Sequence, residues 1–322
     1  MKNAVSVERS YLIPGDIVDI IAPSSKCNPS VLEKITELLA AWGLRCRIPN
    51  DLFGDHLLYA NTNEKRFSHL KEALLNTSSK AVWCLLGGYG ATQLIPMLSK
   101  ISPPAHSKIF IGFSDITALH IFLQGHWGWS TIHGPSGYQA ALNKISADSV
   151  NLLRKLLFHE EHTLAYEAII PLNLAAKNNL VINAPIIGGN LHLIQASLGT
   201  TWQLNADNKI LFIEDINERA YRIDRVLTHL RQAGIMDHPQ AILFGDVIDK
   251  GEPDGKFLVD ETIKAFADQC SVPVLKINHI GHGSINNPLL LGSRVKLSMG
   301  HHYALEFKLE SPLPQKDLIH IN

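Results

Sequence analysis

The chain has 322 residues, of which 46% are hydrophobic and 18% are charged, a composition typical of a folded globular protein. Lys and Arg number 29 and Asp and Glu number 30, so the net charge is −1. The chain therefore lacks the surplus of basic residues that is typical of proteins that bind nucleic acids or membrane surfaces. At about 150 residues per domain, this length predicts two domains.

The N-terminal segment and the cysteines predict a cytoplasmic protein. Residues 1–16 hold no apolar run of signal-peptide length, because Glu8 and Arg9 interrupt them. No uncharged apolar run approaches the roughly 18 residues of a membrane-spanning helix. The four cysteines form no CxxC pair, so we expect free thiols, no metal site and no cofactor.

The first 135 residues alternate short apolar runs with helical patterns. Strands are predicted at 17–22, 44–48, 81–86, 108–113 and 129–132. Helices are predicted between Ser30 and Gly43 and at 63–75, 91–98 and 116–123, with Ser30 and Glu33 as a capping box for the first of these. This alternation predicts a parallel sheet with helices on both faces. Four loops, Pro-Ser-Ser, Gly-Gly-Tyr-Gly, Ser-Asp and His-Gly-Pro, follow its strands, at the edge where ligands bind in such sheets.

The rest of the chain is predicted to form a second, more strand-rich domain. Residues 1–140 form the first domain in this interpretation, 141–182 a linker region and 183–322 the second domain. His159 and His162 of the linker are interpreted as loop residues, not as a metal pair. In the second domain we predict strands at 209–213, 241–247 and 272–278, helices at 218–233 and 259–270, and a closing hairpin of 289–298 with 303–310. The predicted fold class is α/β, an N-terminal parallel-sheet domain plus a β-rich mixed C-terminal domain.

Ser114 is the first candidate for chemistry, because it lies between a buried strand and a helix. There a hydroxyl is exposed and the N–H groups of the helix point toward it. The surrounding Gly-Phe-Ser-Asp-Ile resembles a nucleophile elbow without its final glycine. An ordinary N-cap serine is the alternative interpretation.

A serine nucleophile needs a base and a carboxylate that orients the base. Among the sixteen histidines, His133, His279 and His282 lie just after strands and beside glycines, and His282 has a glycine on each side. The carboxylate candidate is Glu214, which follows four apolar residues at a predicted strand end, with Asp215 and Glu218 as alternatives.

The loop at 87–90, Gly-Gly-Tyr-Gly, offers backbone N–H groups with no side chains in the way. It fits either an oxyanion hole or a phosphate cradle, and a simple tight turn is the third possibility. It is not a Walker A loop, because no Gly-Lys-Ser/Thr follows.

Together these motifs resemble the LD-carboxypeptidases, the S66 serine peptidases, a group that also contains the microcin C self-immunity hydrolases. The resemblance runs from GDIVDIIAPSS at 15–25 to Leu291-Gly292. It includes VWCLLGGYGATQL at 82–94, IGFSDITALH at 111–120, IIGGNLHLIQASLGT at 186–200 and the long ILFIEDINERAYRIDRVLTHLRQAG motif at 210–234. Their joint order and spacing carry the resemblance.

The resemblance implies a catalytic triad of Ser114, Glu214 and His282. It also implies an oxyanion hole made by the backbone N–H groups of Gly88 and Asp115. The family's fold implies a site between the two domains, usually in a homodimer.

Two further positions, Tyr89 and Asn190, are predicted to contact the substrate.

Two departures from the family pattern concern charge. Leu86 precedes the Gly-Gly-Tyr-Gly loop and Gln93 follows it, where family members commonly have arginine. Two cations near the site are therefore absent from the motif.

The implied reaction is hydrolysis of an L,D peptide bond, which removes the terminal D-Ala of a murein tetrapeptide in peptidoglycan recycling. The murein peptide is the expected partner. A microcin-immunity-type hydrolase of peptidyl or aminoacyl nucleotides is the alternative, and Trp202 is its candidate aromatic platform. A non-catalytic binding module is the alternative of another class.

Overall fold

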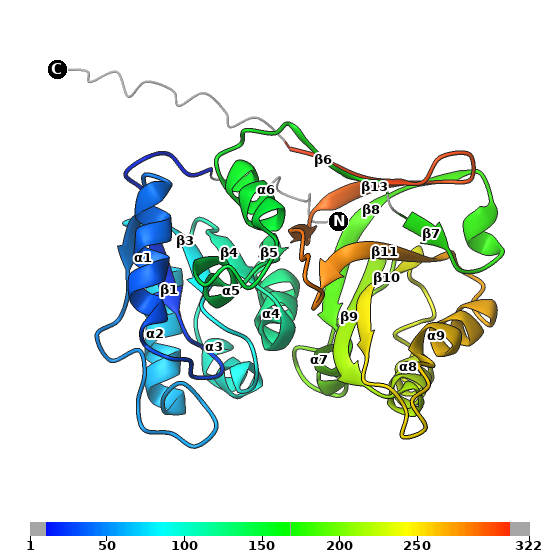
Figure 1. The fold of residues 1–322 in the computed structure, drawn as a ribbon, viewed down its shortest axis with the longest axis horizontal. Coiled ribbons are helices and arrows are strands. Elements are labelled where there is room, and N and C mark those ends of the chain that lie inside the picture. The colour runs from blue at the N-terminus through cyan, green and yellow to red at the C-terminus, as the bar shows by residue number, and fades with distance from the viewer. Residues whose placement is uncertain (1–10, 168, 310–322) are drawn as a thin grey trace.

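The computed structural model describes residues 11–167 and 169–309 as two β-sheets with flanking helices (Figure 1). The first sheet has the strand order β12-β5-β4-β3-β1-β2. Its strands are β1 (Ile17–Ile21), β2 (Arg45–Arg47), β3 (Ser79–Cys84), β4 (Ile109–Gly112), β5 (Thr131–His133) and β12 (Leu289–Leu291). The first five are parallel, and β12 pairs antiparallel with β5.

Helices cover both faces of this sheet because alternate strand residues are apolar on both sides. Ile20 and Trp83 pack in one core, and their neighbours Ile21 and Val82 pack in the other. The helical elements are α1 (Val31–Ala41), α2 (Asn63–Leu75), η1 (Ala91–Leu94), α3 (Ile95–Leu98), η2 (Ser114–Ile116), α4 (Thr117–Trp127), α5 (Gly137–Ala141) and α6 (Ala147–Leu157). Residues of α1, α5 and α6 join the first core, and residues of α2, α3 and α4 join the second.

The second sheet has eight strands in the order β6-β14-β13-β8-β9-β10-β11-β7. Their bounds are β6 (Thr163–Tyr166), β7 (Ile169–Pro171), β8 (Leu180–Asn190), β9 (Ile210–Glu218), β10 (Ala241–Asp249), β11 (Val274–Gly281), β13 (Arg294–Met299) and β14 (Ala304–Lys308). The four central strands are parallel and the outer pairs are antiparallel. The helical elements here are η3 (Ala175–Lys177), α7 (Leu191–Ala196), α8 (Ala220–Gln232) and α9 (Val259–Asp268). The predicted fold class, a parallel α/β part followed by a mixed, strand-rich part, is confirmed.

Several local predictions were wrong for identifiable reasons. Ser30 makes no side-chain cap, because its backbone is already helical (φ −57°, ψ −19°); its N–H instead bonds the Asn28 side chain at 3.0 Å. Strand β9 continues to Glu218, so Glu214 lies inside a strand and not at its end. The closing hairpin is β13 with β14 alone, since β12 joins the first sheet. The last residue predicted for that hairpin, Glu310, lies outside the described residues.

The predicted linker, 141–182, contains α6 and η3 together with β6 and β7, which pair with strands of the second sheet. The division at 140 and 183 stays a prediction. In the described ranges, no helix has both the length and the apolar character needed to cross a bilayer.

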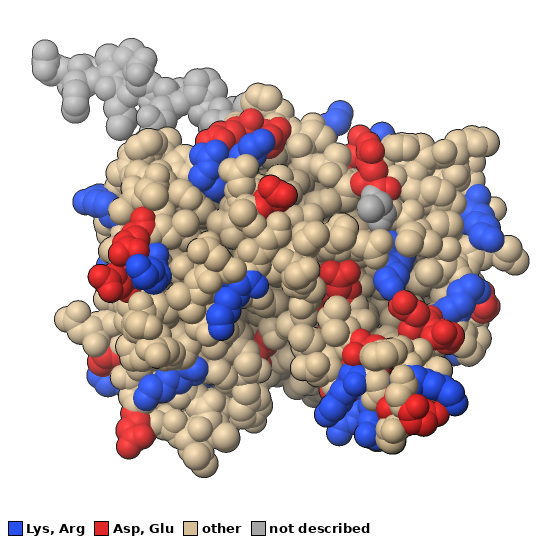
Figure 2. All heavy atoms as spheres, viewed as in Figure 1, with Lys and Arg blue, Asp and Glu red and all other residues tan. Residues whose placement is uncertain are grey.

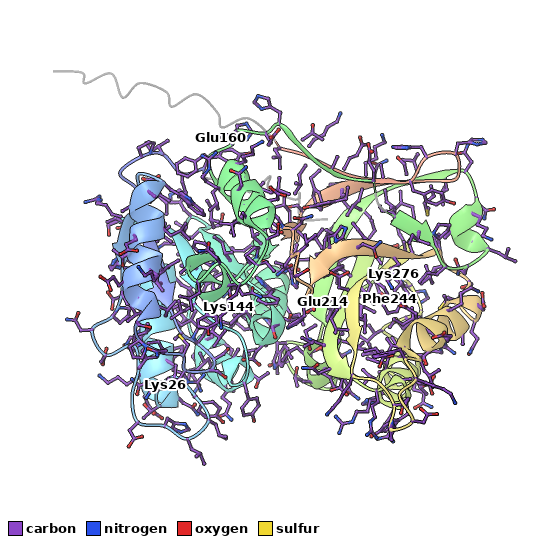
Figure 3. All side chains as sticks on the ribbon, in the orientation of Figure 1. Lys26, Lys144, Glu160, Glu214, Phe244 and Lys276 are labelled. Carbon is purple, nitrogen blue, oxygen red and sulfur yellow. The ribbon has the colours of Figure 1, made fainter. Side chains whose placement is uncertain are left out.

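The two sheets meet where β8 leads into α7 and β4 leads into α4. The N–H of Asn190 donates to the Thr117 hydroxyl at 3.0 Å across this seam. A Cβ on Gly189 would lie 2.5 Å from the same hydroxyl, so only glycine allows this approach. Figure 3 shows Glu214 between the two halves of the molecule. On the face shown in Figure 2, positive and negative side chains are interspersed, and neither sign forms an extended region.

Candidate active site

Ser114 stands on a sharp turn between β4 and α4. Its backbone is left-handed, with φ of +63°, which is a strained conformation for a residue with a side chain. Gly87 of the Gly-Gly-Tyr-Gly loop lies against it, and a Cβ there would be 2.9 Å from the Ser114 Cβ and 3.3 Å from its Oγ. The strained turn therefore presents the hydroxyl directly to the glycine loop, as a nucleophile elbow does.

Glu214 and His282 form the buried acid–base pair of the site. His282 Nδ1 lies 2.5 Å from Glu214 Oε2, although 68 residues separate them in the chain. Glu214 has no exposed surface, and burial raises its pKa, an effect that His282 opposes. Burial by itself would lower the pKa of His282, but the charge and hydrogen bond of Glu214 outweigh this, so that the pKa is raised. The pairing leaves His282 Nε2 for a second partner.

Ser114 is close to this pair but is not bonded to it. Within residues 11–167 and 169–309, no hydrogen bond joins Ser114 to His282. The His282 ring packs instead against Phe113, the residue before the serine, with ring centroids 4.8 Å apart. Catalytic hydrogen bonds are often long in enzymes without substrate and shorten in the complex.

The other candidate histidines lie elsewhere. His133, in β5, is completely buried, and burial holds its pKa well below the usual value. His279 is exposed, and its backbone N–H bonds Asp246 at 3.2 Å. The alternative carboxylates, Asp215 and Glu218, pair with a different histidine, His192. Of the sequence candidates, the structure pairs Glu214 with His282.

Asp115, which follows the serine, ties three catalytic-edge loops together. Its buried carboxylate accepts from the Ser24 hydroxyl at 2.5 Å and from the Ala91 N–H at 2.8 Å. Nearby, the Ser25 hydroxyl accepts from the Tyr89 N–H at 3.1 Å. These bonds fix the Gly-Gly-Tyr-Gly loop on the serine turn, and the N–H groups of Gly88 and Asp115 remain the candidate oxyanion donors.

Arg66 of α2 is the residue that sequence reasoning missed. It is 1% exposed and donates to the carbonyl of Gly90 at 3.0 Å, to that of Asn61 at 3.2 Å and to that of Pro23. Its guanidinium also lies 4.3 Å from the centre of the Tyr59 ring. Although arginine is absent at 86 and 93, the guanidinium of Arg66 therefore contacts the backbone of the glycine loop at Gly90. Its position on the buried stripe of α2, four residues before Leu70, was the available signal.

Gln93, one of the two residues that replace the family's common arginines, is hydrogen-bonded within the protein. The Gln93 amide donates to the Tyr59 hydroxyl at 2.5 Å and accepts from Asn63 at 2.9 Å. Asn63 in turn accepts from Arg66 at 2.6 Å. Gln93 thus belongs to the network that holds Arg66.

The two predicted substrate contacts differ in exposure. Tyr89 is 51% exposed, and its ring leans on that of Tyr59 at 5.5 Å. Asn190 is buried; its oxygen accepts from the Leu193 N–H at 3.3 Å, and its amide donates to Asp215 at 3.0 Å. Both ends of the Asn190 side chain are therefore bonded within the protein.

Trp202, the candidate platform for a nucleobase, is 8% exposed and packs in the second core. A stacking surface on this residue is therefore covered. In the described part of the chain, no group of three or more His, Cys, Asp and Glu side chains is arranged to hold a metal ion.

Comparisons with known proteins identify the family of the chain. The family model for the LD-carboxypeptidase N-terminal domain matches residues 18–134, and that for the C-terminal domain matches residues 183–297. A putative carboxypeptidase of Rickettsia prowazekii is 40% identical, over 91% of this chain and 90% of that protein. The murein tetrapeptide carboxypeptidase of Pseudomonas aeruginosa is 30% identical, over 84% and 89%.

Solved structures show the same fold. The muramoyltetrapeptide carboxypeptidase from Oxalobacter formigenes superposes with a TM-score of 0.76 and 25% identity, over 90% of this chain and 97% of that one. The microcin C7 self-immunity protein MccF superposes with a TM-score of 0.81 at 18% identity, over 95% and 99%, a likeness of fold alone. The chain therefore belongs to the LD-carboxypeptidase family of S66 peptidases and is a serine carboxypeptidase.

Proposed function

We propose that this enzyme removes the terminal D-Ala from murein tetrapeptides through an acyl-enzyme formed on Ser114. The observation that carries the proposal is the Glu214–His282 hydrogen bond of 2.5 Å beside the strained Ser114 turn. A base oriented by a buried carboxylate, near a half-buried serine and a glycine loop, has the parts that acyl transfer needs.

In the first half of the reaction, His282 Nε2 takes the proton of the Ser114 hydroxyl as its oxygen attacks the carbonyl carbon of the L,D bond. Glu214 holds the opposite side of the ring and stabilises the imidazolium. The oxyanion that forms is bound by the N–H groups of Gly88 and Asp115, and one such donor contributes roughly 3 kcal/mol. Collapse of the intermediate breaks the C–N bond, and the D-Ala amine leaves with the proton from His282.

In the second half, water replaces D-Ala in the same site. His282 takes a proton from the water, and the hydroxide oxygen attacks the ester carbonyl. The ester bond then breaks, Ser114 recovers its proton from His282, and the shortened peptide leaves. The same residues thus serve both steps, which explains why a single buried pair is sufficient.

Substrate contact, assembly and location complete the proposal. We place Tyr89 in contact with the substrate, because it belongs to the glycine loop and half of its surface is exposed. For Asn190 we propose positioning in place of direct contact, since its side chain bonds Asp215 and caps α7. The enzyme acts as a cytoplasmic homodimer in peptidoglycan recycling and uses no cofactor.

A microcin-immunity-type hydrolase is the second candidate, because the fold matches that of MccF. The exposed Tyr89 ring, backed by Tyr59 and His56, offers an aromatic face at the mouth of the site. Buried Trp202 offers none. A non-catalytic binding module would show neither activity.

The test compares two substrates. Purified enzyme is given a murein tetrapeptide that ends in diaminopimelate–D-Ala, and separately an aminoacyl-sulfamoyl adenosine, and the products are identified by mass spectrometry. Our proposal predicts release of D-Ala and little cleavage of the nucleotide. Preferential nucleotide cleavage supports the second candidate, and the absence of both reactions, with retained peptide binding, supports a binding module.

A further inference from the structure

A second histidine–carboxylate group lies directly beside the catalytic pair. Asp215, the residue after Glu214, accepts from His192 Nδ1 at 2.6 Å, from the Asn190 amide at 3.0 Å and from the Ile216 N–H at 2.8 Å. His192 stands in the first turn of α7, and its other ring nitrogen lies 3.7 Å from Glu218. No step of the proposed reaction uses this group.

The surroundings of Glu214 make its ionised form costly. Glu214 is fully buried, and its Oε1 has no hydrogen-bond partner within the described residues. His282 and the Asn190 side chain lower the pKa of this carboxylate, whereas its burial and the negative charge of the buried Asp215, one residue away, raise it. Two neighbouring carboxylates in a desolvated site favour protonation of one of them. A protonated Glu214 would no longer stabilise the imidazolium of His282.

We propose that His192 is a positioning residue for the reaction, which as an imidazolium pairs with Asp215, neutralises it and keeps Glu214 ionised on His282. This inference rests on the proposed roles of Glu214 and His282. The hydrogen bond to Asp215 and the charges of Asp215 and Glu218 raise the pKa of His192, against the effect of burial and of Arg222. Its side chain is 32% exposed, so it exchanges protons with solvent.

Different charged groups lie near His192 and near His282. Asp215 and Glu218 of β9 and Arg222 of α8 face His192. The His282 segment is faced by Glu214 and Asp215 from β9, by Asp246 of β10, which lies against Gly283, and by His133 of β5. Asp215 is the group that connects the two histidines. Loss of the His192 charge therefore leaves Asp215 uncompensated and raises the pKa of His282.

The test uses His192→Asn, in which the amide nitrogen takes the place of Nδ1 and keeps the bond to Asp215 without the charge, and His192→Ala, which removes both. His229→Asn is the control, because His229 is exposed on α8 and its ring bonds Gln195 at 3.0 Å. The pKa of His282 is measured by NMR of imidazole-labelled protein, and kcat/KM for D-Ala release is measured against pH.

We expect His192→Asn to raise the pKa of His282 by roughly half a pH unit and to move the acidic limb of kcat/KM upward by the same amount. His192→Ala adds a several-fold loss of kcat. In an Asp215→Asn background, His192→Asn shifts neither quantity, because the charge it balances is gone.

An unchanged His282 titration in His192→Asn, or an equal shift in His229→Asn, would overturn the inference. Because the NMR titration needs no substrate, it decides the inference even if the wild-type enzyme releases no D-Ala. That second result would contradict the proposed function instead. The two failures are therefore distinguishable.

Discussion

Replacement of Arg66 by Met tests whether the buried guanidinium holds the glycine loop in place for catalysis. The substitution keeps the volume of the stem but removes every donor. The carbonyls of Pro23 and Asn61 then lose this partner, and the carbonyl of Gly90 keeps the N–H of Gln93 at 3.2 Å. Hydrogen bonds from charged donors contribute about 1.5–3 kcal/mol each, and the cost of burying the guanidinium offsets part of that gain.

We therefore expect Arg66→Met to lose about 3 kcal/mol of folding stability, because each buried carbonyl left without a donor costs about 1–3 kcal/mol. Unfolding entropy is about 2.1 cal/mol/K per residue, which over 322 residues makes this a decrease of about 4 °C in Tm. Because Gly90 shifts with its loop, the N–H of Gly88 is misplaced. We expect kcat to fall roughly 100-fold with little change in KM, as for loss of an oxyanion donor.

The assay is D-Ala release with kcat and KM determined separately, together with calorimetry. Arg154→Met is the matched control, since Arg154 is 30% exposed and makes a two-point ion pair with Glu160 at 2.5 and 2.7 Å. Such surface pairs contribute about 1 kcal/mol or less, and Arg154 is not part of the site. If Arg66→Met melts earlier but keeps the wild-type kcat, the positioning argument is refuted and Arg66 acts on stability alone.

Two further predictions address the loop and the pH dependence of stability. In Gly88→Ala, the new Cβ would lie 2.2 Å from the Ser25 hydroxyl, at a backbone φ of +100°. We expect this variant to lower kcat/KM more than about tenfold. Gly255→Ala is the control, because Gly255 has a φ of +85° but lies in open space, and we expect its kcat/KM to be unchanged. Burial lowers the pKa of His120 from 6.5 to about 4. Between those values the unfolded chain binds more protons, so stability falls as the pH drops, by about 3 kcal/mol in total for this residue. His120→Gln, which can still donate to the Gly112 carbonyl, should weaken the difference between urea unfolding at pH 7 and pH 5. Equal pH dependence in both proteins would contradict this assignment.

Much of the first sheet is predictable from the sequence because its helices are amphipathic and its strands are apolar runs. Helix 63–75 has both predicted bounds, since Thr62 caps it and its apolar residues recur at helical spacing. The place of β12 is different. Its three leucines carry no periodic signal, and only the free edge of β5, more than 150 residues earlier, determines where they pair.

In the site, too, local sequence identifies some residues, and others depend on long-range contacts. Local sequence identifies Ser114 as a strand-to-helix turn, and the left-handed φ agrees with that interpretation. Sixteen histidines leave the base undetermined by local sequence, and the resemblance to the family selected His282. The roles of Arg66 and His192 depend on contacts with Pro23 and Asp215, which lie 43 and 23 residues away. Such long-range contacts leave no local pattern, apart from the place of Arg66 on the buried stripe of α2.

We propose Ser114 as the nucleophile of an L,D-carboxypeptidase reaction. The most direct measurement is D-Ala release from a murein tetrapeptide by the wild-type enzyme and by Ser114→Ala, both checked for folding by circular dichroism. We predict that release falls at least about 1000-fold in Ser114→Ala, because members of a catalytic triad act as a unit. Equal release by the two proteins would show that Ser114 is not the nucleophile.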